Sequence, residues 1–261
     1  MAGCEAVIHL VGIIRETRRS GSFWEVHVEG TRQVVAAARR AGVRRFVHMS
    51  ALGTRPKAVA RYHQSKWRGE EAVRQGGAET AGGLDWTIFR PSLIHGPDGE
   101  FTQMLRKWVL SKAPPYFFMP YFGGGFWGQS HPRRVQPVYV ADVAAVFVDA
   151  LSTPAARGKT YDLPGPTSYT WPELLRVASA VFQAGPPILV LGIPAWLAGV
   201  MARIAGGRAL PFTRDQVIMS REDNVGDLEA LRADFPQVHV CDFPAALYEY
   251  AVQMGEVKSP R

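Results

Sequence analysis

Residues Ala6-Val7-Ile8-His9-Leu10-Val11 form a run that is apolar at almost every position, and Gly12 follows it. A strand buried on both faces, as in a parallel sheet, has such a composition. Two further short apolar runs, Phe46–Met49 and Trp86–Arg90, follow at intervals that each contain a segment with helical periodicity. Strands that alternate with helices form βαβ units, so the sequence predicts an α/β fold around a parallel sheet.

The pattern of predicted elements changes near residue 163. Before it, helices are expected between the strands, over residues 24–41 (ended by Gly42), 62–73, 101–110 and 142–151, with extended segments at 137–140 and 160–163. After it, a helix is expected to start at Thr170 with Glu173 completing a capping box, and the rest is mostly helical with Pro and Gly breaks. We therefore expect one domain over residues 1–163 and a smaller carboxy-terminal lobe over residues 164–261.

Charge and cysteine content exclude several classes of protein. The 30 Lys and Arg exceed the 23 Asp and Glu, but the basic residues are scattered, so we predict no nucleic-acid binding. The two cysteines form no motif, which argues against a zinc site or a disulfide scaffold, and we predict no bound metal. The amino terminus does not resemble a signal peptide, and the longest apolar stretch, 188–202, is too short to span a bilayer. A cytoplasmic protein, peripheral at a membrane at most, is expected.

Tyr62 and Lys66 form the sharpest chemical motif in the chain. On a helix, residues four apart lie on one face, so the phenol and the ammonium point the same way. A cation beside a phenol favours phenolate, so we expect Lys66 to lower the pKa of Tyr62. Such a tyrosine exchanges protons with a carbonyl or an alcohol, and the alternative is a solvated helix face. Polar residues or glycine also follow three predicted strands, at Gly12, Ser50 and Ser92, where parallel sheets bind ligands.

Six motifs in order carry a specific resemblance to a known family. They are Ala6–Gly12, Glu29-Gly30-Thr31, Val47-His48-Met49-Ser50-Ala51-Leu52-Gly53, the Tyr62/Lys66 pair, Arg90-Pro91-Ser92 and Gln136–Val143. Together they resemble an extended or atypical short-chain dehydrogenase/reductase of the NAD-dependent epimerase/dehydratase type. The chain is most similar to the group that contains the nucleotide-binding accessory subunit of respiratory complex I and its bacterial relatives. Residues 212–217 and 223–225 resemble the carboxy-terminal lobe of that group.

The resemblance implies a fold, a cofactor and a set of site residues. It implies a Rossmann-like doubly wound sheet with its amino-terminal strands missing, so that residues 1–163 form a partial NAD(P)-binding domain. The cofactor is NAD or NADP, and the sequence leaves the choice open. Candidate catalytic residues are Tyr62, Lys66 and Ser50. Candidate cofactor contacts are Leu10, Val11, Gly12, Ser50, Tyr62, Lys66, Pro91, Ser92 and Ile94. Candidate substrate contacts are His95 and Gln136.

Three departures from the family pattern bear on activity. No glycine-rich turn that would hold the pyrophosphate precedes residues 6–11. Leu52, which cannot donate a hydrogen bond, stands where the family usually has a serine or threonine. His27 stands where the family commonly has an asparagine that helps a proton relay. Because the strand at residues 6–11 would lack its usual neighbour, we expect an amino-terminally truncated fragment or a misplaced start codon.

The sequence leaves two hypotheses of function open. The first function is a dinucleotide-binding protein with weak or no turnover, beside a membrane redox complex. The second is an NAD(P)-dependent reductase, epimerase or dehydratase that acts on a small carbonyl or nucleotide-sugar substrate.

An aromatic flap near residues 114–130 either packs on the lobe or contacts an apolar ligand, lipid or partner. Within residues 188–204 a helix that begins near Pro194 is expected, either buried in the carboxy-terminal lobe or lying at a membrane interface. His9 and His48 are expected to be hydrogen-bonded residues of the core or of a sheet end.

Overall fold

The computed structural model describes residues 3–17, 19–78, 83–114, 116–122, 133–182, 189–194, 196, 197, 200 and 213–255. The chain divides into two compact units. Unit 1 comprises residues 1–91, 143–164 and 226–238, and unit 2 comprises residues 92–142, 165–225 and 239–261. This division differs from the continuous ranges 1–163 and 164–261 expected from the sequence. The chain leaves the sheet after Pro91 and returns to it before residue 164, so each unit collects separate segments.

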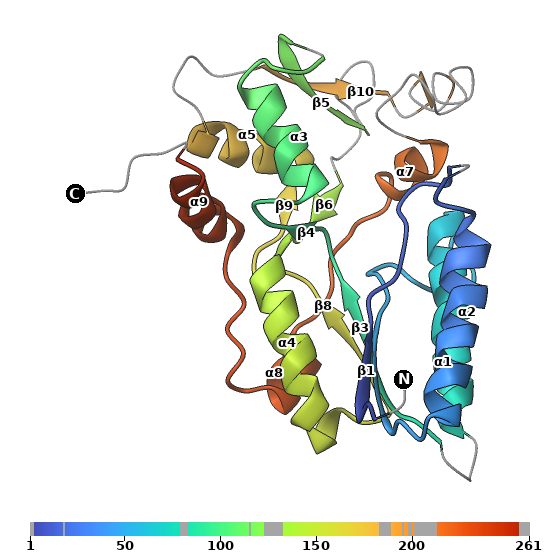
Figure 1. Cartoon of the computed structure of the whole chain (residues 1–261). Coiled ribbons are helices and arrows are strands. Elements are labelled where there is room, and N and C mark those ends of the chain that lie inside the picture. The colour runs from blue at the N-terminus through green and yellow to red at the C-terminus, as the bar shows by residue number, and fades with distance from the viewer. Residues whose placement is uncertain are drawn as a thin grey trace. The chain divides into compact units, whose positions relative to one another are not determined.

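Unit 1 is built on a four-stranded parallel sheet (Figure 1). Its strands, in spatial order, are β1 (Ala6–His9), β2 (Arg45–Met49), β3 (Asp85–Pro91) and β8 (Lys159–Leu163). Helices α1 (Gly30–Arg40) and α2 (Arg61–Ala78) lie on one face of the sheet, and α4 (Val140–Ser152) lies on the other. Phe147 of α4 packs on Phe89 of β3, with ring centroids 4.9 Å apart. The predicted Rossmann-like parallel α/β fold is confirmed.

Strand β1 is shorter and less buried than the sequence suggests. It ends at His9, and Ala6, Val7 and Ile8 are only half-buried. Its single partner among the described residues is β2, in the register Ala6↔Arg45 to His9↔His48. Because a strand at the edge of a sheet has one neighbour, its side chains are covered less than those of a central strand. The expectation of a strand buried on both faces is therefore wrong for β1, whereas four residues of its neighbour β2 are buried.

Small residues and one buried arginine explain the close packing of unit 1. A Cβ added at Gly69 would lie 2.7 Å from the backbone oxygen of His27. Only glycine therefore lets α2 pack this closely against the backbone at His27. Gly42, at φ +73°, ends α1 as predicted. Arg45 donates to the carbonyl of Ala150 at 2.9 and 2.6 Å and to the hydroxyl of Thr87 at 2.6 Å. Burial lowers the pKa of the Arg45 guanidinium, and these acceptors join the end of α4 to the sheet.

The described part of unit 2 contains four helices and three pairs of strands. Its helices α3 (Glu100–Val109), α5 (Trp171–Phe182) and α9 (Phe243–Gln253) enclose a core that includes the fully buried Met119 and Tyr250. The strand pairs are β4 (Ile94–His95) with β7 (Val138–Tyr139), β6 (Arg134–Val135) with β9 (Tyr169–Thr170), and β5 (Phe118–Phe122) with β10 (Leu189–Ile193). The remaining elements of the described residues are α7 (Arg214–Met219) in unit 2 and η1 (Trp24–Glu29), η2 (Pro154–Ala156) and α8 (Glu229–Asp234) in unit 1.

Two predictions about unit 2 have different outcomes. The capping box at the start of α5 is confirmed: the Thr170 N–H donates to the Glu173 carboxylate at 2.7 Å, and the Glu173 N–H donates to the Thr170 hydroxyl at 3.4 Å. Residues 189–193, which precede the helix expected to begin near Pro194, form β10, and most of that expected helix lies outside the described residues. Residues 118–122 of the expected aromatic flap form β5, and residues 123–130 lie outside the described part of the chain.

Candidate functional site

Gly12 brings its backbone close to the amine of Lys66. A Cβ built on Gly12 would lie 3.0 Å from Lys66 Nζ and 3.5 Å from His27 Nε2. Leu10 and Val11, which precede it, are 52% and 58% exposed. The missing side chain therefore leaves space next to a buried ammonium group, at the carboxyl end of a parallel strand. That is where sheets of this type bind ligands.

Lys66 is the buried cation of this site. Its side chain extends from α2, is 4% exposed, and donates from Nζ to the backbone oxygen of Met49 at 3.1 Å. Burial lowers the pKa of Lys66 to about 8, and the charge of Glu70 partly opposes that change. A lysine ammonium carries three donor hydrogens, so Lys66 can bond a ribose hydroxyl in addition to Met49.

Tyr62 lies one turn before Lys66 on α2 but does not have the expected pKa. Its ring packs edge-on against Phe23 and His27, with centroids 5.7 and 5.5 Å apart. Burial raises the pKa of Tyr62 to about 12. The expected lowering is therefore wrong in this structure, because loss of solvation disfavours the charged phenolate.

His27 connects the turn after β1 to helix α2. The Ile13 N–H donates to His27 Nε2 at 3.0 Å, which places the ring proton on Nδ1. Nδ1 lies 2.8 Å from the Ser65 hydroxyl, which in turn donates to the Tyr62 carbonyl at 2.7 Å. Burial lowers the pKa of His27 to about 3, so the ring is neutral. With both ring nitrogens bonded in this way, His27 holds the Gly12 turn against α2.

Ser50 uses its hydroxyl in a buried polar network. It is 3% exposed and donates to Glu70 Oε1 at 2.6 Å. Glu70 is fully buried and also accepts from Arg90 at 2.8 and 2.7 Å and from Arg74 at 2.7 Å. A hydroxyl has one proton to donate, and that of Ser50 is given to Glu70. Leu52, two residues on, is buried and apolar. The catalytic role of Ser50 stays a prediction.

Glu70 was not among the residues singled out from the sequence. Its signal was present, because Tyr62, Lys66 and Glu70 are spaced by four and share one face of α2. The other half of that signal is Arg90 at the end of β3, which follows Glu70 by 20 residues and pairs with it. A helix carboxylate followed by an arginine at a strand end can thus indicate a buried pair under the carboxyl edge of a sheet.

The two histidines expected in the core differ from each other. His9 contacts the hydroxyl of Thr31 at 3.1 Å and stacks on His48, with ring centroids 5.2 Å apart. Neither ring nitrogen of His48 has a hydrogen-bond partner among the described residues, so the expectation is wrong for His48. Burial and the charge of Lys66 lower the pKa of His9 to about 4 and that of His48 well below its usual value. Both rings are therefore neutral.

The remaining predicted contacts divide between the two units. Pro91 is in unit 1, where its carbonyl accepts from the Leu52 N–H at 2.8 Å. Ser92 and Ile94 are in unit 2, where the Ser92 hydroxyl donates to the Asn224 side chain and Ile94 begins β4. The structure thus brings Gly12, Tyr62 and Lys66 together in unit 1, close to the end of β2.

The two predicted substrate contacts are also in unit 2. His95 is 1% exposed, and its Nδ1 lies 3.3 Å from the Tyr250 hydroxyl. The ring stacks near Tyr139 and packs edge-on against Phe243, and burial lowers its pKa to about 4. The structure therefore places His95 in the core of unit 2 and not on a surface open to substrate. Gln136 is half-buried and donates to the Gly165 carbonyl at 3.2 Å, and its contact with substrate stays a prediction.

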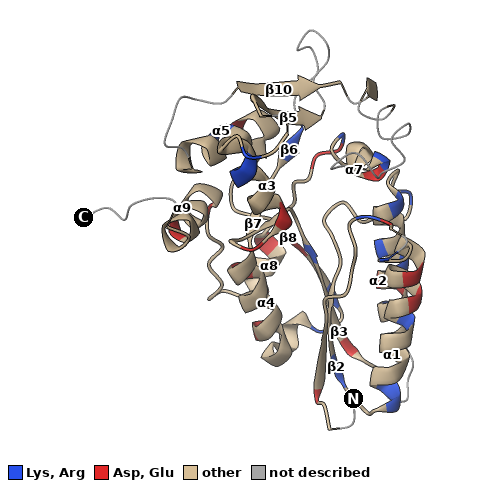
Figure 2. Cartoon of the chain, turned by 45° about the horizontal axis from the view of Figure 1, so that its top comes forward, with Lys and Arg blue, Asp and Glu red and all other residues tan. Residues whose placement is uncertain are grey.

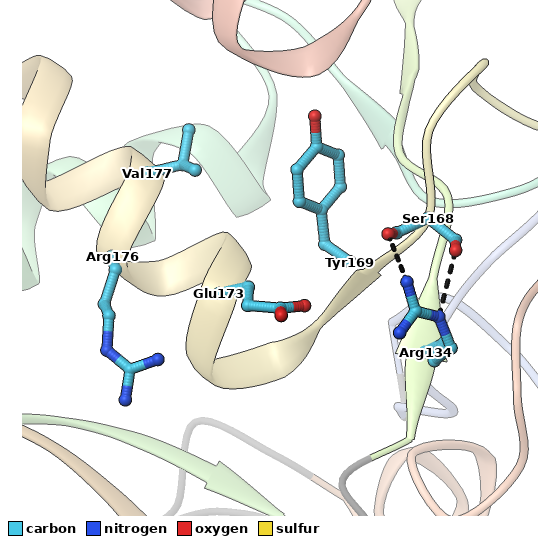
Figure 3. Close-up of a pocket in the computed structure, with 6 residues that line it drawn as sticks. All are labelled: Arg134, Ser168, Tyr169, Glu173, Arg176 and Val177. Carbon is cyan, nitrogen blue, oxygen red and sulfur yellow. Dashed lines mark hydrogen bonds between the residues drawn. The ribbon is translucent and has the colours of Figure 1, made fainter.

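A hollow of about 420 Å³ lies on unit 2 between β6, β9 and α5 (Figure 3). Six residues line it: Arg134, Ser168, Tyr169, Glu173, Arg176 and Val177. Arg134 donates to the Ser168 hydroxyl at 2.9 Å and to the Ser168 carbonyl at 2.6 Å, while Glu173 accepts from the Thr170 backbone. These bonds account for the turn and the start of α5. Within the described ranges, His, Cys, Asp and Glu form no group of three that could bind a metal ion.

Substitution of Gly12 tests the space beside Lys66. A Gly12→Ala variant should bind NADH about tenfold more weakly, roughly 1.4 kcal/mol, because the new methyl group occupies the position next to Lys66 Nζ. Folding should change little, since the end of a lysine side chain can move by a few tenths of an ångström. A Gly30→Ala control adds a methyl group at ordinary contact distance in α1 and should bind normally. Equal affinity of all three proteins by fluorescence titration would contradict the assignment.

Comparison with known proteins agrees with a dinucleotide site in unit 1. A family model described as NAD(P)H-binding matches residues 1–107. NADH dehydrogenase (ubiquinone) 1 alpha subcomplex subunit 9 of Arabidopsis thaliana is 31% identical over 195 residues, covering 74% of this chain and 44% of that protein. A ceramide reductase of Caulobacter vibrioides is 33% identical over 192 residues, covering 74% of this chain and 55% of that protein. The chain thus spans about half the length of the curated relatives it matches.

A solved structure shows the same fold. UDP-glucuronic acid 4-epimerase of Bacillus cereus, in complex with UDP-glucuronic acid and NAD, superposes with a TM-score of 0.67 at 15% identity, covering 96% of this chain and 76% of that chain. The fold and the sequence match together define an NAD(P)-binding protein with a Rossmann-like sheet. It is related to subunit 9 of complex I and has the fold of the epimerases, as the motifs indicated. The expected cofactor class, NAD or NADP, is confirmed.

Proposed function

We propose that this chain binds NAD(P) through unit 1 with weak or no turnover and works beside a membrane redox complex. The proposal rests mainly on the side chains of Ser50 and Leu52, which follow β2. The Ser50 hydroxyl is donated to the buried Glu70, and Leu52 has no polar group. In addition, the pKa of Tyr62 is about 12, which makes its phenol a poor proton donor near neutral pH.

The residues of unit 1 nevertheless fit a bound dinucleotide. Gly12 leaves space beside the Lys66 amine, which can donate to a ribose hydroxyl. His27 keeps the Gly12 turn in place through Ile13 and Ser65. These groups bind and orient, and none of them has to change its protonation state to do so. For a binding role, Tyr62 therefore needs only to pack its ring in place and does not have to exchange a proton.

The place beside a membrane complex is proposed from the relative named as a subunit of NADH dehydrogenase. None of the helices in the described residues is long and apolar enough to cross a bilayer. We propose that this association uses the surface of the described units. Expression with an affinity tag, followed by native electrophoresis of mildly solubilised membranes, tests this point. Comigration with NADH dehydrogenase activity is expected, and migration of the free chain alone would contradict the proposal.

Substitution of Tyr62 separates binding from catalysis. A Tyr62→Phe variant should keep its dissociation constant for NADH within about twofold, because the ring packing survives and the affinity depends on Lys66 and Gly12. Fluorescence titration measures the affinity, and reduction of a panel of small aldehydes and ketones measures turnover. A Tyr116→Phe control removes the hydroxyl of an exposed tyrosine in unit 2. If the unchanged chain turns over and Tyr62→Phe does not, the proposal of weak turnover is wrong.

The alternative is an NAD(P)-dependent reductase, epimerase or dehydratase for a small carbonyl or nucleotide-sugar substrate. It is favoured by the shared helix face of Tyr62 and Lys66 and by the relative named as a reductase. The nicotinamide would supply or accept the hydride when bound. Tyr62 would hold the proton that passes to or from the substrate oxygen, and Lys66 would orient the ribose. Loss of turnover in Tyr62→Phe at unchanged affinity is the result that this alternative predicts.

A further inference from the structure

The two-stranded ribbon of unit 2 has apolar side chains on both faces. Strands β5 and β10 are parallel and pair in the register Leu189↔Phe118 to Ile193↔Phe122. Since side chains alternate along a strand and paired positions share a face, the ribbon has two distinct sides. Met119, Tyr121 and Val190 lie on one side and pack on the core of unit 2. The other side carries only apolar residues, namely Phe118, Pro120, Phe122, Leu189, Leu191 and Ile193.

This outer side is open to solvent. Leu189 is 59% exposed and Leu191 is 40% exposed. Phe117, directly before β5, is 87% exposed, and Trp196, three residues after β10, is 64% exposed. Single exposed apolar residues are ordinary, but several along one side of a ribbon and at its ends indicate an interaction surface. We call this group, Phe117, Phe118, Pro120, Leu189, Leu191 and Trp196, the ribbon face.

The two stretches of sequence that contain the ribbon strands carry charges of one sign. Residues 101–141, which contain β5, hold five Arg or Lys and no Asp or Glu. Residues 174–214, which contain β10, hold four Arg or Lys and no Asp or Glu. All 23 acidic residues of the chain lie elsewhere, and Figure 2 shows β5 and β10 without charged residues. Lys107 and Lys112 at the end of α3 are exposed and close together, since the Lys112 N–H donates to the Lys107 carbonyl at 2.7 Å.

We propose that the ribbon face docks on an anionic lipid bilayer. Its aromatic and aliphatic side chains would enter the boundary between headgroups and acyl chains, while Lys107 and Lys112 lie among the lipid phosphates. The absence of acidic residues from both stretches matches a surface of uniform negative charge. A second copy of this chain fits less well, because it would bring cations of the same sign together. The inference deepens the proposed place at a membrane, but it rests on residues of unit 2 alone.

Vesicle flotation of the full chain tests this inference. The chain should float with vesicles that contain phosphatidylglycerol and not with pure phosphatidylcholine, and high salt should weaken the binding. Two variants, Phe117→Glu and the double change Leu189→Glu with Leu191→Glu, should each bind anionic vesicles at least tenfold more weakly. A matched control, Val148→Glu, changes a valine of α4 that is 58% exposed and should float normally.

Three outcomes overturn the inference. The first is no flotation with anionic vesicles at low salt. The second is equal flotation of the unchanged chain and both ribbon variants. The third is a dimer in size-exclusion chromatography that the ribbon variants abolish, which would identify a second copy as the occupant. NADH titration of the same samples keeps the tests separate: normal NADH binding without flotation overturns the inference alone, whereas flotation without NADH binding overturns the proposed function alone.

Discussion

Replacement of Glu70 by glutamine should lower the free energy of unfolding of unit 1 by about 3 kcal/mol. The carboxylate is fully buried and accepts four hydrogen bonds of 2.6 to 2.8 Å, from Ser50, Arg74 and Arg90. An amide of the same shape has one acceptor oxygen and presents its own N–H groups to a guanidinium. It also removes the charge that compensates Arg90, whose side chain is only 19% exposed. Removal of one partner from a buried ion pair costs far more than loss of an exposed one.

Chemical denaturation with circular dichroism measures this effect, and the neighbouring residue supplies the control. Glu71 pairs with Arg68 on the surface of the same helix, where the two side chains are 34% and 56% exposed. A Glu71→Gln variant should therefore lose less than about 0.5 kcal/mol. If Glu70→Gln is as stable as Glu71→Gln, the network does not hold the ends of β2 and β3 against α2, and the account of Ser50 given above fails with it.

Local patterns were sufficient to predict β2, β3 and α2 of unit 1. The apolar runs at 46–49 and 86–90 became β2 and β3, and the periodic segment at 62–73 became the middle of α2. These segments follow from spacing that a sequence displays directly. Strand β10, at the start of the apolar run 188–204, was not predicted, for the converse reason. Continuous apolar sequence has no period that separates a buried strand from a helix, and β10 forms because β5 offers it a partner from 71 residues earlier in the chain.

The candidate site shows the same limit at the level of side chains. That Tyr62 and Lys66 share a face follows from helix geometry, and the space at Gly12 follows from its place after a strand. The pKa of Tyr62 could not be read in this way, because it depends on how Phe23 and His27 cover the ring. Nor could the partner of Ser50, since the contact with Glu70 joins a strand end to a helix. Sequence spacing predicts which of these side chains share a face, whereas their pKa values and hydrogen-bond partners depend on tertiary packing.

Replacement of Lys66 by methionine should weaken NADH binding by roughly 10- to 100-fold and, at the same time, stabilise the free protein. Loss of affinity follows from removal of the buried donor beside Gly12. The gain in stability follows from burial, which lowers the pKa of Lys66 from 10.5 to about 8 and so disfavours the charged amine in the folded chain. A shift of that size corresponds to about 3 kcal/mol, from which the lost bond to Met49 subtracts about 1 kcal/mol.

The pH dependence of stability provides an independent check that Lys66→Met stabilises the free protein. Between pH 8 and 10.5 the unfolded chain holds the Lys66 proton and the folded chain does not. The unfolded state then binds more protons, so the contribution of Lys66 to stability rises with pH across this window. Lys66→Met lacks that rise. The stability difference between Lys66→Met and the unchanged chain should therefore be largest below pH 8 and shrink toward pH 10.5.

A surface lysine of the same unit separates this effect from a general loss of charge. Lys57 is exposed, so Lys57→Met should change neither NADH affinity nor the pH dependence of unfolding. If Lys66→Met is destabilised at neutral pH, the amine contributes more through its bond to Met49 than its burial costs. If Lys66→Met binds NADH normally, the dinucleotide does not use the space beside Gly12. The combination of weaker binding and higher stability is the result expected of a residue kept buried for its ligand, since packing alone would favour methionine.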